Sequence, residues 1–100
     1  MRPPVTIDAA QTTTINAIES EMFIINLLTS ISTLRIKNVT PGLLYVFVLK
    51  QNSAGGNTVN WGSGVLNATA PNPRPHSTTV QTLVGNSDGT LWANLPGTWS

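Results

Sequence analysis

The sequence predicts an all-β fold, a single-domain antiparallel β-sandwich or barrel-like jelly roll of about seven or eight short strands. Three observations predict it. Segments rich in β-branched residues recur at short intervals, turn residues separate them, and stretches that favour a helix are nearly absent. The length of 100 residues and the hydrophobic content of 40% suit one domain with its own core.

The first half of the chain is expected to contain strands at 12–18, 22–28, 32–39 and 43–49. Residues 18–21 are expected to form the turn between the first two strands. The third strand alternates cleanly, with Leu34 and Ile36 on one side and Arg35 and Lys37 on the other. This pattern is typical of a half-solvated antiparallel strand.

The strand at 43–49, LLYVFVL, is apolar on both faces. A turn at 38–42 precedes it, in which proline presets φ and glycine accepts a positive φ. A strand with two apolar faces lies in the middle of a sandwich, or its outer face is covered by another subunit. Both alternatives remain open from the sequence.

The segment KQNSAGGNTVNW at 50–61 predicts a hairpin, in which 58–61 is the returning strand and the double glycine reverses the chain. Residues 71–76, PNPRPH, predict an extended crossover outside the strand ladder, because proline lacks the backbone donor. The segments 78–84 and 90–95 are expected to pair as a last hairpin around a glycine-bounded loop. The single domain spans 1–100, with an N-terminal arm at 1–10 and a C-terminal tail at 96–100.

Charge is unusually scarce in this sequence. Only 9% of residues are charged, against roughly 25% in ordinary soluble domains. Serine, threonine, asparagine and glutamine make up 35 of the 100 residues. Such an exterior suits a subunit whose faces are occupied by neighbours, because a free domain usually relies on charge for solubility.

Several classes of partner and site are excluded by composition. The basic residues are scattered, so no patch neutralises the phosphates of a nucleic acid. No apolar stretch reaches the length of a membrane span, and the N-terminus has no secretory signal pattern. The chain has no cysteine, so neither a disulfide nor a thiolate metal site is expected, and we expect no cofactor.

The residues able to carry catalysis are few. His76 lies in the proline-rich crossover with no acidic residue nearby in the sequence, so we interpret it as an exposed loop residue. Glu19 and Glu21 are interpreted as a solvated turn, because glycosidase chemistry needs two opposed carboxylates in a cleft. Asp8 and Asp88 are the remaining carboxylates. We therefore expect no enzyme.

Two glycine-rich loops and two sequons also receive structural interpretations. The loop at 53–56 lacks the Lys-Ser/Thr ending and the following helix of a phosphate-binding loop. The Gly-Ser-Gly at 62–64 is too short for a nucleophile elbow. The sequons at Asn38 and Asn67 are interpreted as chance matches, because no secretory signal is present.

Three tryptophans have alternative interpretations. Together they could line a platform for sugar rings, but Trp61 and Trp92 are better interpreted as core residues on strands. Trp99 lies one residue from the end, so we expect the tail to dock onto the body or onto a neighbouring subunit.

A recurring order of short motifs resembles a known family. An apolar strand ends in Leu-Lys-Gln, a double-glycine loop and Thr-Val-x-Trp follow, and the last hairpin carries Asp-Gly-Thr-Leu-Trp at 88–92. This order is similar to a small β domain of tailed-bacteriophage virion proteins, found at tail-fibre and baseplate tips and in short structural proteins. The likeness covers about residues 8–95. Trp61-Gly62 departs from the family pattern, which often has Trp-Pro there, and this departure puts loop-borne binding specificity in doubt.

The resemblance implies a structural protein of the virion, assembled in the cytoplasm of the host bacterium. The leading hypothesis is a capsid decoration (cement) protein, a homotrimer that binds the major capsid protein between capsomers and stabilises the shell. Met1 opens the sequence, and about ten residues precede the first expected strand, which favours this stand-alone role. The alternatives are a fibre or baseplate tip that binds a bacterial surface receptor or glycan, and a small hydrolase or lectin-like accessory.

Contacts with partners are expected in three parts of the chain: the proline-stiffened arm, the loop after the apolar strand, and the tail. A proline-stiffened arm loses less conformational entropy when it is ordered across a neighbour. The residues concerned are Arg2, Pro3, Pro4, Val5, Asn52, Ser53 and Trp99.

Overall fold

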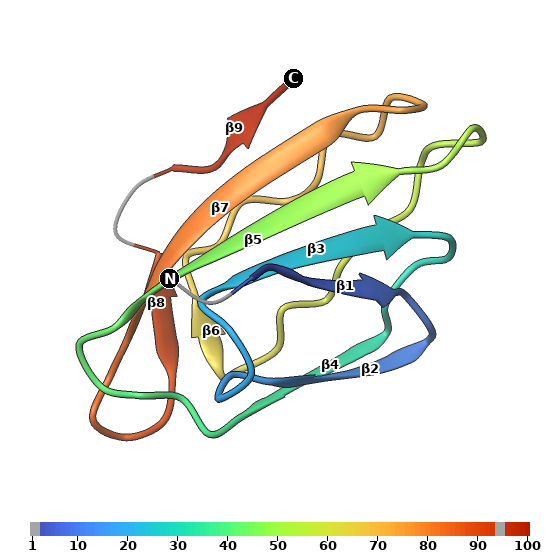
Figure 1. The fold of residues 1–100 in the computed structure, drawn as a ribbon. Coiled ribbons are helices and arrows are strands. Elements are labelled where there is room, and N and C mark those ends of the chain that lie inside the picture. The colour runs from blue at the N-terminus through green and yellow to red at the C-terminus, as the bar shows by residue number, and fades with distance from the viewer. Residues whose placement is uncertain (1–2, 94–95) are drawn as a thin grey trace.

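The computed structural model describes residues 3–93 and 96–100, which form an all-β domain (Figure 1). The all-β prediction is confirmed. Nine strands lie within these described ranges: β1 (Val5–Asp8), β2 (Thr12–Asn16), β3 (Met22–Leu27), β4 (Thr33–Lys37), β5 (Leu44–Gln51), β6 (Val65–Leu66), β7 (Thr78–Gly85), β8 (Leu91–Ala93) and β9 (Thr98–Trp99).

The main sheet is mixed, so the prediction of a purely antiparallel sandwich or jelly roll is wrong. Its order is β1-β3-β5-β7-β8-β6, and β9 also pairs with β7. Strands β1, β3 and β5 are parallel, whereas β7 is antiparallel to β5. The expected arm contains β1, which pairs with β3 at the edge of the main sheet.

A coiled path of the chain explains the parallel pairs. After each of β1 and β3 the chain crosses to a second sheet, runs back as β2 or β4, and returns to the main sheet (Figure 1). Strands β2 and β4 are therefore parallel to each other. Strand β4 has the expected alternation of Leu34 and Ile36 with Arg35 and Lys37, but the predicted antiparallel pairing is wrong.

The segment at 50–61 also follows this coiled path. Residues 58–61 do not return beside β5, so the predicted hairpin is wrong. Val59 instead bridges Ile31 in parallel, and Asn60 N–H donates to the Ile31 carbonyl at 2.9 Å, in the second layer. The expected role of the double glycine is confirmed, since Gly55 and Gly56 have φ of 67° and 73°. A Cβ on Gly55 would also lie 2.7 Å from the Pro73 carbonyl oxygen.

The second half of the chain closes the sheet. The expected last hairpin is confirmed, because β7 and β8 are antiparallel and join through residues 86–90. The proline-rich segment at 71–76 lies outside the strands, as predicted. Its Asn72 is buried, and the Asn72 N–H donates to Thr79 Oγ1 at 2.8 Å.

The core lies between the two layers. Phe23 and Phe47 meet edge to face with their centroids 5.6 Å apart, and Phe47 stacks on Trp61 at 5.9 Å. Tyr45 is fully buried, and its hydroxyl accepts a hydrogen bond from the Thr40 N–H at 2.8 Å. The core interpretation of Trp61 is confirmed, since the indole packs against the buried cluster.

Candidate interaction surface

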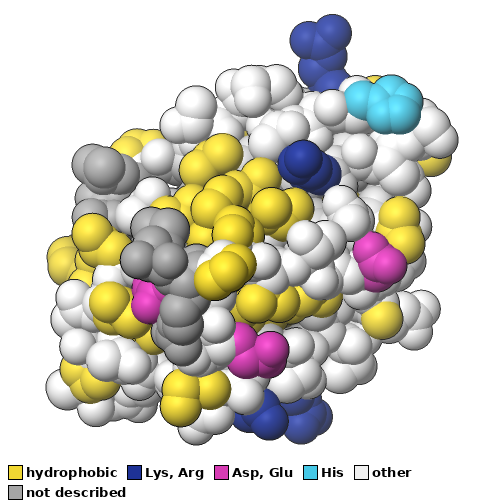
Figure 2. Space-filling view, in the orientation of Figure 1, with side chains coloured by type: hydrophobic (Ala, Val, Ile, Leu, Met, Phe, Trp, Pro, Cys, Tyr) yellow, Lys and Arg dark blue, Asp and Glu magenta, His cyan; other side chains and the backbone are white. Residues whose placement is uncertain are grey.

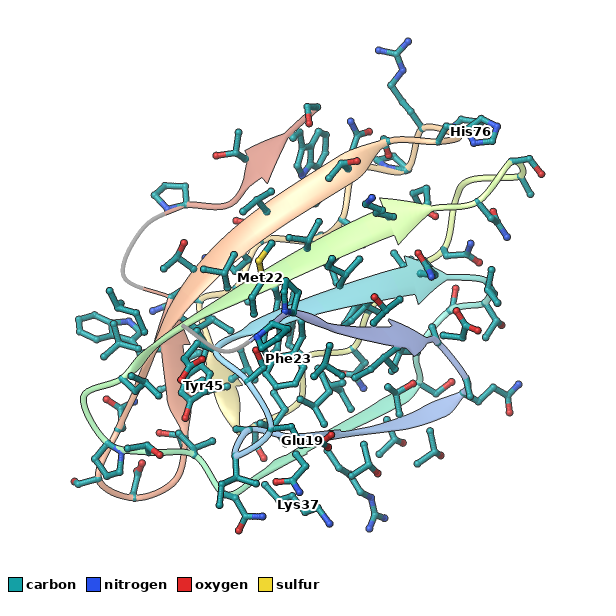
Figure 3. The ribbon with its side chains drawn as sticks, viewed as in Figure 1. Glu19, Met22, Phe23, Lys37, Tyr45 and His76 are labelled. Carbon is teal, nitrogen blue, oxygen red and sulfur yellow. The ribbon has the colours of Figure 1, made fainter. Side chains whose placement is uncertain are left out.

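Alternation along the strands divides the main sheet into two faces. In β3, Phe23, Ile25 and Leu27 are buried against the second layer, whereas Met22 and Ile24 point away from it. Figure 3 labels Met22 and Phe23, the consecutive residues that begin this alternation. The face that points away from the second layer is called the outer face below.

The outer face is apolar across neighbouring strands. The strand register aligns Ile24 with Val48, Val48 with Val80, and Val46 with Met22. A third row carries larger side chains along β5, β7, β8 and β6: Leu44, Val84, Trp92 and Leu66. Figure 2 shows hydrophobic side chains gathered over the centre of this face, with charged side chains around it.

Most apolar side chains of the outer face are accessible to a partner, whereas Val48 at its centre is buried. Leu44 is 52% exposed, Trp92 49% and Leu66 46%. Met22, Ile24, Val46, Val80 and Val84 are partly exposed. The interpretation of Trp92 as a core residue is therefore wrong: its neighbour Leu91 takes the inward position on β8, and alternation turns Trp92 outward.

The second sheet provides an internal comparison. Its outward positions carry only polar side chains, namely Thr12 and Thr14 on β2 and Thr33, Arg35 and Lys37 on β4. That is the usual pattern of a sheet with one face in water. The same chain thus builds one sheet with a polar outer side and one with an apolar outer side.

One border of the outer face is polar and charged. The register aligns Asp8, Asn26, Lys50 and Thr78 across β1, β3, β5 and β7. Asn26 Nδ2 donates to Asp8 Oδ1 at 3.1 Å. This row limits the apolar area at the ends of β1, β3 and β5 and gives the face one polar edge.

The carboxylate of Asp88 accepts hydrogen bonds that stabilise the loop of the last hairpin. The Thr90 hydroxyl donates to Asp88 Oδ1 at 2.6 Å, and the Thr90 N–H donates to the same oxygen at 3.1 Å. These hydrogen bonds favour the ionised form, so the pKa of Asp88 lies below its usual range. Asp88 therefore has a role in the turn.

The residues expected to contact partners do not lie together. Arg2 lies outside the described residues. Pro3 and Pro4 are exposed before β1, and the Pro3 carbonyl accepts a hydrogen bond from Ser20 Oγ at 2.9 Å. Val5 packs against the core within β1. Because β1 and β5 run parallel, these residues lie about 16 Å along the strand direction from Asn52.

The loop and tail residues are held by internal contacts. Asn52 Oδ1 accepts hydrogen bonds from the N–H groups of Ala54 and Gly55, while Ser53 is exposed at the tip. The tail docks onto the body, which is one of the two alternatives expected for Trp99. Strand β9 pairs with β7, and Trp99 Nε1 donates to the Ala70 carbonyl at 2.9 Å.

The candidates for catalysis are dispersed. His76 is exposed in a turn with φ of 57°, and Figure 3 shows His76 and Glu19 at opposite ends of the molecule. Within residues 3–93 and 96–100, no pocket is found and no group of His, Asp and Glu is arranged to hold a metal ion. The same ranges contain no helix with the length and hydrophobicity to cross a membrane.

Sequence reasoning missed most of the outer face. The sequence indicated that β5 has two apolar sides. It did not indicate that Met22 and Ile24 on β3, and Val80 and Val84 on β7, extend the outward side of β5 across three strands. The clue in the sequence was the run Met22–Leu27, which is apolar at five of six positions and so has two apolar sides.

The fold and the outer face define a small all-β domain whose mixed main sheet has a partly exposed apolar face. No protein-family model matches the chain, and no curated protein sequence or solved structure is significantly similar to it.

Proposed function

We propose that this chain is a structural protein of a bacteriophage virion, specifically a capsid decoration protein that binds the shell with the outer face of its main sheet. The observation that carries the proposal is the contrast between the two sheets. The outward positions of β2 and β4 are polar, whereas those of β3, β5 and β7 are largely Met, Ile, Leu and Val.

The outer face has the chemistry of a protein interface. Burying one Val, Leu or Ile side chain contributes about 1.5–3 kcal/mol, so several such residues supply a substantial driving force for association. A standard interface takes roughly 800 Å² from each partner. That area is about 15% of the 5345 Å² accessible surface of this chain.

The loop at 52–56 supports the capsid proposal over a receptor-binding tip. Asn52 Oδ1 accepts from Ala54 N–H, from Gly55 N–H and from Asn57 Nδ2 at 3.2 Å. These internal hydrogen bonds occupy Asn52 Oδ1, one of the polar atoms through which the loop could bind a glycan. The motif resemblance supplies the virion context. The expected homotrimer stays a prediction.

The test is to add the purified chain to capsids assembled without it. Stoichiometric co-sedimentation, together with greater heat resistance of the capsids, supports the proposal. Binding to host cells or to isolated surface glycan, without capsid binding, contradicts it and favours the tip module.

A further inference from the structure

We propose that the coil formed by β1 and β2 pairs with the same coil of a second copy of this chain, through two-fold antiparallel strand pairing. We call residues 5–16 the open coil. This surface differs from the outer face, so the inference does not depend on the proposed function.

The open coil is the first layer of a short stack. Each coil gives one strand to each sheet, so Val5 pairs with Phe23 and Phe23 with Phe47 in the main sheet. In the second sheet Thr12 pairs with Thr33, and Ile31 bridges Val59. A stack of coils leaves unpaired backbone groups at its first layer, and both sheets end there.

The hydrogen bonds that follow β1 and β2 identify the outward groups. Ala9 N–H donates to the Asn26 carbonyl at 2.9 Å, and Ala17 N–H donates to the Lys37 carbonyl at 2.8 Å. Because backbone groups alternate in direction along a strand, those of Thr6 and Asp8 on β1, and of Thr12 and Thr14 on β2, point away from the stack. Among the described residues, no strand pairs with this side of β1 or β2.

The two edges carry little of the usual protection against pairing. Sheet edges are commonly blunted by shortness, by charged side chains, especially lysine, by proline within the strand or by a bulge. The sequences of β1 and β2 are VTID and TTTIN, which contain neither lysine nor proline, and Asp8 is their only charged residue. The open coil is therefore competent to accept another strand.

The pattern of outward groups is self-complementary. If Ile7 lies on a two-fold axis, Thr6 of one copy and Asp8 of the other form a hydrogen-bonded pair, and the symmetric pair forms as well. The Thr6 hydroxyl can donate to the carboxylate of Asp8 in the other copy. The charge of Asp8 is thus accommodated within the contact.

The same axis serves the second sheet. The turn between β1 and β2 is centred near Ala10, and the Ala10 N–H donates to Thr13 Oγ1 at 3.1 Å. Thr13 follows Ala10 by as many residues as Ile7 precedes it. An axis through both positions pairs Thr12 with Thr14 of the other copy. One two-fold rotation therefore pairs the outward backbone groups of both β1 and β2 with those of the other copy.

In the main sheet, the strand at the other end of the stack already has a partner. The outer edge of β5 is occupied by β7, which is antiparallel and pairs along its length from Lys50 to Leu44. An incoming open coil finds no free edge at β5. Because a two-fold contact uses the same edge of both copies, the pairing closes as a dimer at this edge, and the predicted homotrimer would form through another surface.

The first test measures the dimer by native mass spectrometry and sedimentation of the full chain. Thr6→Pro removes the outward N–H of Thr6 but no bond to β3, whereas Thr6→Ser keeps both the N–H and the hydroxyl. We expect Thr6→Pro to weaken the dimer about 30-fold, because two backbone hydrogen bonds are lost, and Thr6→Ser to preserve it. A wild-type monomer, or an assembly that Thr6→Pro leaves unchanged, would overturn the inference.

The second test uses the absence of cysteine in the chain. In a non-hydrogen-bonded antiparallel pair the Cα atoms are about 4.5 Å apart, within the range of a disulfide. Ile7→Cys is therefore expected to form an intermolecular disulfide under mild oxidation, whereas Val80→Cys on the outer face is not. Cross-linking of Val80→Cys alone would overturn the inference. Circular dichroism verifies that each variant is folded.

Discussion

The side chain of Gln51 and the backbone of Asn57 form a reciprocal pair of hydrogen bonds. Gln51 Nε2 donates to the Asn57 carbonyl at 2.8 Å, and the Asn57 N–H donates to Gln51 Oε1 at 3.2 Å. Gln51 Nε2 also donates to the Asn72 carbonyl at 3.1 Å. The buried side-chain amide of Gln51 thus supplies hydrogen bonds to the backbone where the chain leaves β5. The same amide joins the loop that follows β5 to the crossover at 71–76.

Replacing Gln51 by leucine is expected to destabilise the fold by about 2–4 kcal/mol, because the N–H and the carbonyl of Asn57 lose their partner and the Asn72 carbonyl keeps only Ser77 Oγ. Gln11→Leu is the matched control, since Gln11 is exposed, and it is expected to change stability by less than about 0.5 kcal/mol. Urea denaturation measures both. Equal stabilities of the two variants would disprove the role assigned to Gln51.

A second pair of substitutions tests close packing at Gly85. A Cβ there would clash with the Thr40 carbonyl oxygen and lie 2.8 Å from Val39 Cγ1, whereas a Cβ on Gly64 meets nothing within 4 Å. Gly85→Ala is therefore expected to cost about 2 kcal/mol or more, and Gly64→Ala is expected to be nearly neutral. The difference in thermal midpoint between the two variants decides the matter.

The tryptophans Trp61 and Trp92 are expected to differ in their effect on stability. Trp61 stacks on Phe47 and its Nε1 donates to the Thr69 carbonyl at 3.2 Å, whereas Trp92 is 49% exposed on the outer face. Trp61→Ala should cost about 3 kcal/mol, and Trp92→Ala about 1 kcal/mol or less. A larger loss for Trp92→Ala would mean that its indole belongs to the core.

The hydrogen bonds from Thr90 make the titration of Asp88 a test of the last turn. Because the folded-state pKa is lowered, ionised Asp88 stabilises the fold at pH values above its ordinary pKa. This contribution is lost as the pH falls through the lowered pKa. Thr90→Val should raise the pKa of Asp88, whereas Thr90→Ser, which keeps the hydroxyl, should leave it low. Carbon NMR of the Asp88 carboxyl measures the change, and an unchanged pKa in Thr90→Val would contradict the assignment.

Local features of the fold were predictable from sequence, because they depend on neighbouring residues. Alternation located β4 and β7, the proline-rich segment marked the crossover, and the glycine-bounded loop marked the last turn. The parallel direction of β1, β3 and β5 was not predictable in the same way. The direction of each strand depends on the path of the chain after the preceding strand. The sequence separation of paired residues grows from 18 between Val5 and Phe23 to 24 between Phe23 and Phe47, so the sequence shows no fixed repeat.

The apolar outer face was partly predictable from the sequence. The run LLYVFVL already indicated a strand with two apolar sides, and the structure supplies the neighbours that widen one side into the outer face. Contacts with a partner are predicted in the arm and tail because a proline-stiffened arm costs little entropy to order and chain ends are usually disordered unless they are held. They are predicted in the loop because its tip is expected to be exposed. Instead, Val5 is paired within β1, and the hydrogen bonds of Asn52 and Trp99 hold the loop and the tail to the body.

The central claim is that the outer face of the main sheet binds the virion shell. The most direct measurement is co-sedimentation of Ile24→Lys with capsids assembled without the protein. Thr58→Lys is the matched control, because it adds the same charge at an exposed position in the second layer. We predict that Thr58→Lys binds as the unaltered chain does and that Ile24→Lys, while folded, loses binding at least about tenfold. Undiminished binding of a folded Ile24→Lys would contradict the account.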